Sequence, residues 1–505
     1  MGAVLLPSSP IQASVVVADA ARERIERNVE ICFDGPLIDS MSPLPFQGGS
    51  SSWHHEPAHW VIPALANAHD HGRGLPTLAY GAGDDALELW IAALVAHPII
   101  DPGLLAQLAL AKLVRSGVSS VVHCHNPQNH ERPVEEALAV CTAARRIGVR
   151  LAYVVPLADR NPIGYGPTDA ILSHVNGPAR AWLADIAERK PARPAEQVGL
   201  VERIAEAVEG DLITVQYGPV GPQWASNELL QAVADASQRT GRRVHMHLLE
   251  TLRQRQWADA VYDGALLEFL DQIGLLSARL TVAHGVWLAE SELELLAERE
   301  VIVSVNTSSN LRLRSGTAPV HAMRRAGTSF AFGMDGMSID DDEDALRELR
   351  LTHLLHGGCD MVREMSASET LHRAVSVGHR AVDGSLNHGS LTAGSPGDLV
   401  VLDGVAMAGD LLLGLTPETE VIVARACSDH VRQVVINGKV VVDHGRVVGV
   451  DEAEVADEVF ARHRAAAGET RRLQPLIRAH QEALCSFYRA GGHLHPLPEP
   501  VGSER

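Results

Sequence analysis

Three short runs of the chain carry side chains that bind metal ions. In the run HDHG, His69 and His71 stand two residues apart, and the run HMHLLE repeats this spacing with His245 and His247. Asp335 stands alone in the run GMDG. Side chains two apart on a β-strand point to the same face, so each histidine pair can reach one ion. Neutral imidazoles with one carboxylate suit Zn²⁺ or Fe²⁺ and leave a position open for water. The sequence therefore predicts a divalent metal site, with zinc preferred over iron.

These runs fall at the ends of β-rich segments that alternate with helical stretches, a pattern typical of parallel βαβ units. The candidate strands are Val61–Ala68, Val118–His125, Val149–Val155, Leu212–Tyr217, Val244–Leu249, Leu280–His284, Val301–Asn306 and Ser329–Gly333. Eight such strands predict an α/β fold, a (β/α)8 TIM barrel, whose active site lies at the carboxyl ends of the strands. An open, doubly wound sheet is the alternative that spacing alone leaves open.

Both ends of the chain depart from this pattern. β-branched runs separated by Asn-Gly and His-Gly turns predict hairpins after residue 389. Strands are expected at Ala13–Val17 and Val29–Phe33, followed by a loop from Pro36 to Ser52. We expect four parts: residues 1–60 and 389–450 as the two halves of a small composite β-sandwich, residues 61–388 as the barrel, and residues 451–505 as a C-terminal helical tail.

The composition excludes several classes of protein. The chain has 505 residues, 46% of them hydrophobic and 21% charged, which is typical of a globular protein. Its net charge of −20 disfavours binding to nucleic acid or to an anionic membrane. Six scattered cysteines without a CxxC pair disfavour a disulfide framework. The start MGAVLLPSSP lacks the charged segment of a signal peptide, so we expect a cytoplasmic protein. We also expect a homodimer or larger homo-oligomer.

Taken in order, the runs HDH, HMHLLE, AHG and MDG resemble the amidohydrolase superfamily, and within it the branch of cytosine deaminases, guanine deaminases and chlorotriazine hydrolases. The stretch NTSSNLRLRSGTAPV is similar to the loop after the seventh strand in that branch. The resemblance implies four metal ligands, namely His69, His71, His247 and Asp335. It also implies that Glu250 shuttles protons, that His284 contacts the attacking water or the substrate, and that Asp335 accepts a proton from that water.

The lysines decide between two variants of this superfamily. The chain has only three, Lys112, Lys190 and Lys439. Binuclear members of the superfamily bridge two metals through a carboxylated lysine on the fourth strand, and the candidate strand Leu212–Tyr217 contains none. The resemblance therefore implies one metal ion.

The expected chemistry is hydrolysis of a carbon–nitrogen bond. Such a metal lowers the pKa of a bound water to about 7, which supplies a nucleophile, and the leaving amine then needs an acid that protonates it. Glu250, three residues after His247, is the candidate acid. We predict a metal-dependent hydrolase of non-peptide C–N bonds, foremost a deaminase of a cyclic amidine such as a nucleobase, pterin or triazine. The alternatives are displacement of alkylamine or chloride, opening of a cyclic amide or imidazolone ring, and, more remotely, a non-catalytic scaffold.

Six further residues are candidates for contact with a heterocyclic substrate. Arg73 is suited either to pair with an anionic substrate or to form a supporting salt bridge. Trp224 is suited to stack on a flat ring. The other candidates are His125, Asn306, Ser309 and Asn310, the last three for hydrogen bonds to the edge of the ring. For each residue singly, core packing or loop capping is the competing interpretation.

Two features leave alternatives open. The insertion from Pro156 to Val198, with Tyr165 and Trp182, is long for a barrel loop and is either a lid or an oligomer contact. His123 and His125 end the second strand, where we favour a packing or substrate-facing role over a second metal.

Overall fold

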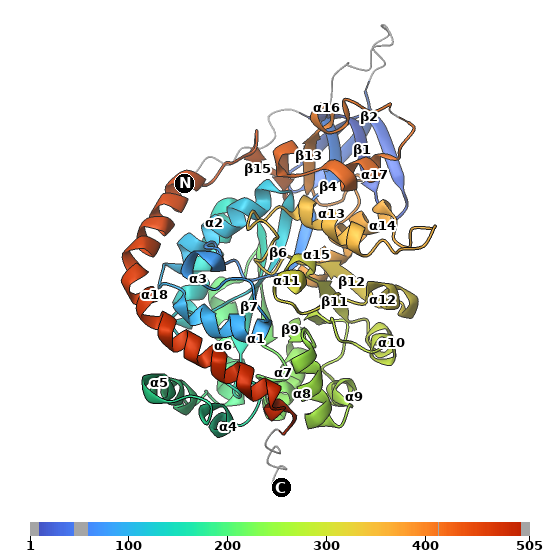
Figure 1. Cartoon of the computed structure of the whole chain (residues 1–505). Coiled ribbons are helices and arrows are strands. Elements are labelled where there is room, and N and C mark those ends of the chain that lie inside the picture. Colours follow the sequence, from blue (N-terminus) through green and yellow to red (C-terminus); the bar gives the residue numbers. More distant parts are fainter. Residues whose placement is uncertain (1–9, 45–58, 413, 496–505) are drawn as a thin grey trace.

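The computed structural model describes residues 10–44, 59–412 and 414–495. Its centre is a parallel sheet whose strands pair in sequence order: β5 (Leu65–Asp70), β6 (Val118–Cys124), β7 (Arg150–Leu157), β8 (Ile213–Pro219), β9 (Val244–Leu248), β10 (Leu280–His284), β11 (Ile302–Val305) and β12 (Ser329–Phe332). The end of β12 returns to β5, where the backbone N–H groups of Met334 and Asp335 donate to the His69 carbonyl at 3.0 and 2.9 Å. The predicted (β/α)8 barrel is confirmed, and the open sheet is wrong (Figure 1).

Helices surround this barrel (Figure 1). They are α1 (Leu87–Ala93), α2 (Pro102–Arg115), α3 (Pro133–Ile147), α4 (Thr168–Leu172), α5 (Gly177–Glu188), α6 (Pro194–Val208), α7 (Asn227–Thr240), α8 (Leu252–Tyr262), α9 (Leu266–Gln272), α10 (Glu290–Glu298), α11 (Thr307–Arg312), α12 (Val320–Ala326), α13 (Ala345–Leu355), α14 (Ala367–His372) and α15 (Gly378–Asp383). Local signals set their ends: Asp101 caps α2 by accepting from the Leu104 N–H, Ser226 caps α7 in the same way, and Gly327 ends α12 at φ +76°.

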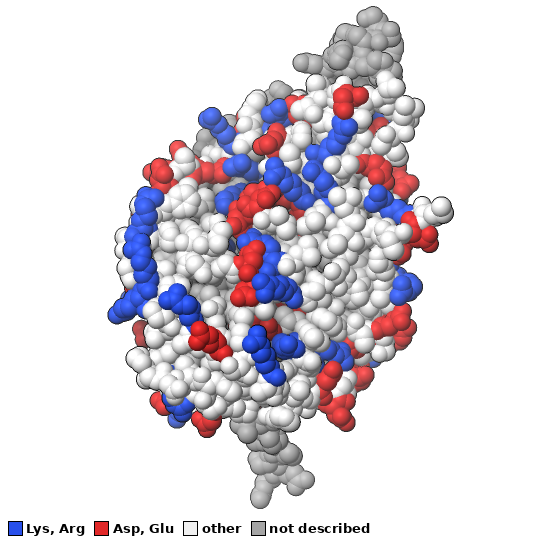
Figure 2. All heavy atoms as spheres, in the orientation of Figure 1, with Lys and Arg blue, Asp and Glu red and all other residues white. Residues whose placement is uncertain are grey.

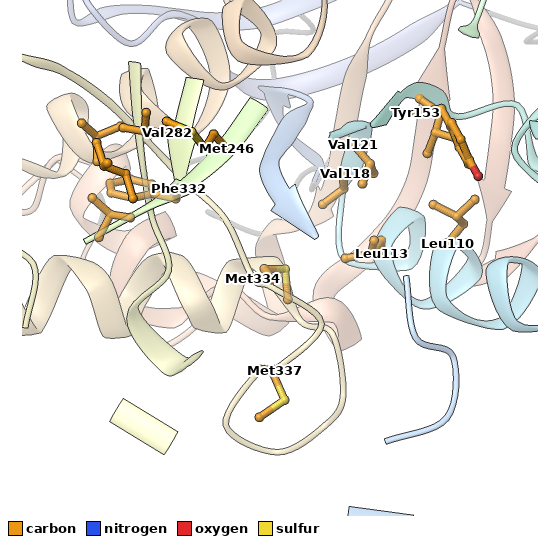
Figure 3. Close-up of a cluster of buried hydrophobic side chains, with 14 of the residues drawn as sticks. Leu110, Leu113, Val118, Val121, Tyr153, Met246, Val282, Phe332, Met334 and Met337 are labelled. Carbon is orange, nitrogen blue, oxygen red and sulfur yellow. The ribbon is translucent and has the colours of Figure 1, made fainter. Parts of the chain in front are cut away.

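The strands are buried on both faces, as a barrel requires. All seven residues of β6 are buried, because the side chains of one face fill the barrel and those of the other meet the helices. Figure 3 shows Leu110 and Leu113 of α2 beside Val118 and Val121 of β6. This apolar packing fixes the strand ends on which the polar residues stand.

A second sheet is built from both ends of the chain. Its order is β16-β15-β14-β13-β4-β1-β2-β3, and its strands are β1 (Ile11–Asp19), β2 (Arg24–Asp34), β3 (Leu37–Pro43), β4 (His59–Pro63), β13 (Leu399–Asp403), β14 (Val431–Ile436), β15 (Lys439–Asp443) and β16 (Arg446–Val447). Helices α16 (Gly404–Ala408) and α17 (Glu418–Arg425) follow β13. The predicted Asn437-Gly438 turn is confirmed, with both residues at positive φ (+55° and +68°).

Two predictions for the N-terminal part need correction. The expected loop from Pro36 to Ser52 contains strand β3, which pairs antiparallel with β2, and its residues from 45 onward lie outside the described residues. The expected strand Val61–Ala68 is two strands that meet at Ala64. The first, β4, joins the terminal sheet and only the second, β5, enters the barrel.

The C-terminal tail expected to be helical, residues 451–505, contains α18 (Glu452–Arg489), which runs along one side of the barrel (Figure 1). Its side chains bind backbone carbonyls of α1 and of the segment between β7 and α4. Gln481 donates to the Leu89 carbonyl at 2.9 Å, and His480 Nε2 bonds the Ile163 carbonyl at 2.9 Å. The insertion that follows β7 forms α4 and α5 and packs against α18.

Two further features are the distribution of surface charge and the state of the cysteines. On the face shown in Figure 2, acidic and basic side chains are interspersed. All six cysteines are free thiols, and Cys124 and Cys141 are buried. Within the described part of the chain, no helix combines the length and apolarity needed to cross a membrane.

Candidate metal centre and active site

Three strand ends bring the candidate metal ligands together. His69 lies near the end of β5 and His71 directly follows this strand, His247 lies on β9, and Asp335 follows β12. The Asp335 Oδ1 atom lies 3.3 Å from His69 Nε2 and 3.2 Å from His71 Nε2. The Nε2 atoms of His71 and His247 are 3.4 Å apart. Asp335 reaches this position with a φ of +60°, a backbone conformation that is strained for a residue with a side chain.

The outer nitrogens of these imidazoles are held by hydrogen bonds. His71 Nδ1 lies 2.8 Å from the Cys124 carbonyl, and His247 Nδ1 lies 2.7 Å from the Val220 carbonyl. A carbonyl oxygen only accepts, so the proton of each ring is on Nδ1 and the lone pair is on Nε2. His69 Nδ1 is similarly 2.8 Å from His245 Nε2. The free lone pairs therefore face one another inside the site.

This arrangement fits a cation. His69 Nε2 and Asp335 Oδ1 are buried and have no hydrogen-bond partner among the described residues. Burial lowers the pKa of His69 to about 3, of His71 to about 4 and of His247 to about 3, so the rings are neutral. Lone pairs that converge with no proton between them repel one another, and a divalent metal satisfies all of them. Three imidazole nitrogens and one carboxylate oxygen suit zinc or iron.

The Asp335 carboxylate is held in place by a hydrogen bond on its other oxygen. Ser309 donates its hydroxyl to Asp335 Oδ2 at 2.5 Å. Ser309 belongs to α11, whose position is fixed by hydrogen bonds from the Ser308 N–H and hydroxyl to the buried Glu348 carboxylate.

Glu250 and His284 lie next to this centre. Glu250 is only 2% exposed, and burial raises its pKa to about 7. Its Oε2 atom is 3.7 Å from His284 Nε2, and Ser315 donates to its Oε1 atom at 3.0 Å. The opposite nitrogen of the His284 ring, Nδ1, is 2.9 Å from Asn310 Oδ1. The structure thus gathers all three residues that the resemblance implied as catalytic.

A cavity of about 450 Å³ opens beside His71. Arg73, His123 and His125 line it. His125 Nε2 is 2.7 Å from the Glu136 carboxylate, and His123 stacks on Tyr153 with ring centroids 5.8 Å apart.

The remaining substrate candidates do not line the cavity beside His71. Trp224 lines a separate cavity of about 200 Å³, between the insertion and α18, where its ring meets Tyr165. Asn306 lies with its Nδ2 atom 3.2 Å from His284 Nδ1. Asn306, Ser309 and Asn310 therefore contact the candidate catalytic groups.

Sequence reasoning missed several supporting groups. Ser315, which holds Glu250, follows it by 65 residues, and no spacing rule connects the two. The Cys124 and Val220 carbonyls that orient two imidazoles belong to the backbone, so residue type carries no signal. The sequence did contain a signal for His245 as a supporting group, because it shares a strand face with His247. The structure shows that His245 contacts the His69 ring.

A closed parallel barrel with imidazoles and a carboxylate converging at its strand ends is the architecture of the metal-dependent barrel hydrolases. The particular family follows from a comparison of sequences. The model of the amidohydrolase family matches residues 60–441, so the chain belongs to this family.

Two similar proteins align with most of this chain. A 5'-deoxyadenosine deaminase of Methanopyrus kandleri is 30% identical over 407 residues, which cover 79% of this chain and 84% of that protein. A 5-methylthioadenosine/S-adenosylhomocysteine deaminase of Bacillus cereus is 30% identical over 409 residues, with 79% and 85% covered.

Solved structures share the fold. An adenosine deaminase from Xanthomonas campestris with bound zinc gives a TM-score of 0.72 at 23% identity, covering 92% of this chain and 98% of that one. The atrazine chlorohydrolase of Arthrobacter aurescens TC1 complexed with zinc gives a TM-score of 0.72 at 21% identity, covering 89% and 98%.

Proposed function

We propose that the protein is a metal-dependent aminohydrolase that releases ammonia from an amino-substituted heteroaromatic ring. The observation that carries the proposal is the convergence of unpartnered Nε2 and carboxylate atoms beside Glu250. One divalent cation would be held by His69, His71, His247 and Asp335. Zinc is preferred over iron, because the structures with similar folds described above contain zinc.

When bound there, the metal supplies Lewis-acid activation of water. The protein's own groups supply proton transfer. A pKa of about 7 lets Glu250 hold or release a proton near neutral pH, so it is suited to protonate a ring nitrogen and then the departing amine. Ser315 holds one oxygen of this carboxyl group and leaves the other facing His284. His284, held by Asn310, is suited to orient the attacking water.

The substrate is proposed by analogy with the relatives. Both curated relatives described above are named as deaminases of adenine nucleosides or thionucleosides, so we place adenine-type nucleosides first and other cyclic amidines second. The cavity beside His71 is within the usual size range of small-molecule sites, about 300–1,000 Å³, and would hold the ring. Asn306, Ser309 and Asn310 then act mainly by positioning His284 and Asp335.

The test is an ammonia-release screen with the metal-loaded protein. Adenosine, 5'-deoxyadenosine, aminopyrimidines, aminopurines, pterins and triazines are compared with ring analogues that carry chloride or an alkylamine. We expect ammonia from at least one amino-substituted ring. Release of chloride or alkylamine in the absence of any ammonia would overturn the aminohydrolase proposal in favour of a displacement reaction.

We also propose that the protein forms a homo-oligomer. Leu354, Met361 and Val362, close together in sequence, expose 62%, 102% and 77% of their surface, and exposed apolar groups favour association. Light scattering at several protein concentrations tests this, and the mass of a single chain at every concentration would contradict it.

A further inference from the structure

Arg73 has an unusual environment for an arginine. It follows His71 by two residues and lines the cavity beside that histidine. Its Nε and Nη1 atoms are buried, and within the described part of the chain they have no hydrogen-bond partner. The guanidinium carbon lies 5.0 Å from the centroid of the Trp90 ring, which fixes the side chain by a cation–π contact but provides no counter-charge.

The nearby carboxyl group of Asp70 interacts with Arg73 electrostatically, but it is hydrogen-bonded to other groups. Asp70 accepts hydrogen bonds from the Gly72 N–H and the Asn67 amide, both at 2.7 Å, and from the Gly336 N–H at 3.3 Å. No ion pair joins Arg73 to any described residue. The supporting salt bridge, one of the two roles considered for Arg73 above, is therefore absent from the described part of the chain.

The other described walls of the cavity contain no acidic side chain. Among the described residues that line it, Arg73 holds the one fixed charge. Polar groups come from His123, His125 and Gln128, and the apolar part comes from residues such as Leu94 and Ile99. A partly buried guanidinium without an anion is unfavourable unless something else supplies the negative charge.

We propose that Arg73 is the anchor of an anion subsite, and that the substrate is an amino-substituted heterocycle that carries an acidic group, a carboxylate or a phosphate. This inference rests on the proposed function. The acid lies against the guanidinium on the His123 side of the cavity, and the ring lies toward His71 and Glu250. Charge-assisted hydrogen bonds from Arg73 then select acidic substrates over neutral ones of the same shape.

A binding measurement tests the subsite without turnover. Nicotinate and nicotinamide, which are flat rings that differ in a carboxylate against an amide, are titrated into the metal-loaded protein by calorimetry. We expect the wild type to prefer nicotinate by about 10-fold or more and Arg73→Met to lose that preference. Because the metal also attracts the carboxylate, the decisive quantity is the change in preference between the two proteins.

The matched control is Arg132→Met. Arg132 is an exposed arginine at the start of α3, outside the cavity. We expect this variant to keep the preference for nicotinate. Metal content and melting temperature show whether each variant is folded. An unchanged preference in a folded Arg73→Met protein would overturn the subsite, and so would an equal loss in Arg132→Met.

Turnover then separates the subsite from the proposed function. Pterin-6-carboxylate is compared with pterin, and adenosine monophosphate with adenosine, so that the two pairs distinguish a carboxylate from a phosphate. For the preferred acid, we expect Arg73→Met to raise KM by about 30-fold or more. If the protein releases ammonia but Arg73→Met does not change KM for the acidic member of either pair, the subsite is overturned and the proposed function stands. Arg73-dependent nicotinate binding without ammonia from any ring overturns the proposed function only.

Discussion

Replacement of Glu250 by Gln isolates the proposed proton shuttle. Gln has nearly the same volume as Glu, and its amide oxygen can still accept the hydrogen bond from Ser315 that now ends on Glu250 Oε1. The backbone N–H of residue 250 also keeps its bond to Gln254, at 2.8 Å. Gln does not transfer a proton, so the variant removes this one property and leaves the donor atoms of the metal site in place.

The expected loss follows from the role of this carboxyl group. Glu250 is 2% exposed, so bulk water does not replace it as a proton donor. General acid–base catalysis contributes about 10²–10⁴-fold to a rate, and we expect kcat to fall by about 10³-fold, or about 4 kcal/mol in the activation barrier.

The assay measures ammonia release, metal content and melting temperature on the same preparations. The control is Glu292→Gln, which changes another buried glutamate. Its carboxylate binds Arg255 and the Ala289 N–H at the start of α10, and it makes no hydrogen bond to Glu250, His284 or the metal ligands. We expect this control to keep its turnover. A folded, metal-loaded Glu250→Gln protein with kcat within about 3-fold of the wild type would refute the proposed role of Glu250.

Two further predictions concern stability. Burial raises the pKa of Glu348 from 4.5 to about 7, so the unfolded chain loses this proton at lower pH than the folded chain, and the free energy of unfolding falls as the pH rises through this window. Urea denaturation measures the free energy of unfolding of Glu348→Gln minus that of the wild type. This difference should therefore rise by about 3 kcal/mol from pH 4 to pH 8. A difference that is independent of pH would contradict this. The Tyr488 hydroxyl of α18 accepts a hydrogen bond from the Tyr165 N–H at 3.1 Å. Tyr488→Phe leaves that buried N–H without a partner and should cost about 1–3 kcal/mol, whereas a loss below about 0.5 kcal/mol would show that α18 does not hold the insertion through this bond.

The barrel was predictable because its strands are short apolar runs with clear ends. All eight candidate strands overlap strands of the barrel, and Leu280–His284 has the same bounds in both. The break at Ala64 was overlooked because the residues on both sides of it are apolar and buried, although Pro63, which has no backbone N–H to donate, was a signal for it. Only pairing with different sheets separates β4 from β5. Strand β3 was missed because its run Leu37–Pro43 contains Asp, Ser and Pro, which are typical of loops.

The site was predictable in part, for a similar physical reason. His69, His71, His247 and Asp335 stand at strand ends, and parallel strands of a barrel bring their carboxyl ends together. The supporting contacts depend on loop paths between distant segments. The structure alone shows that Asn310 meets His284 and that Trp224 faces a different cavity from His71.

The metal content of the purified protein tests the proposed centre. Wild-type protein prepared without chelators is compared by elemental analysis with His247→Ala, which removes a donor, and with His123→Ala, which removes a buried histidine outside the donor set. We predict about one divalent metal per chain in the wild type and in His123→Ala, and less than about 0.1 in His247→Ala. A wild type without metal, or a His247→Ala protein that retains the full amount, would contradict the assignment of these residues to one metal ion.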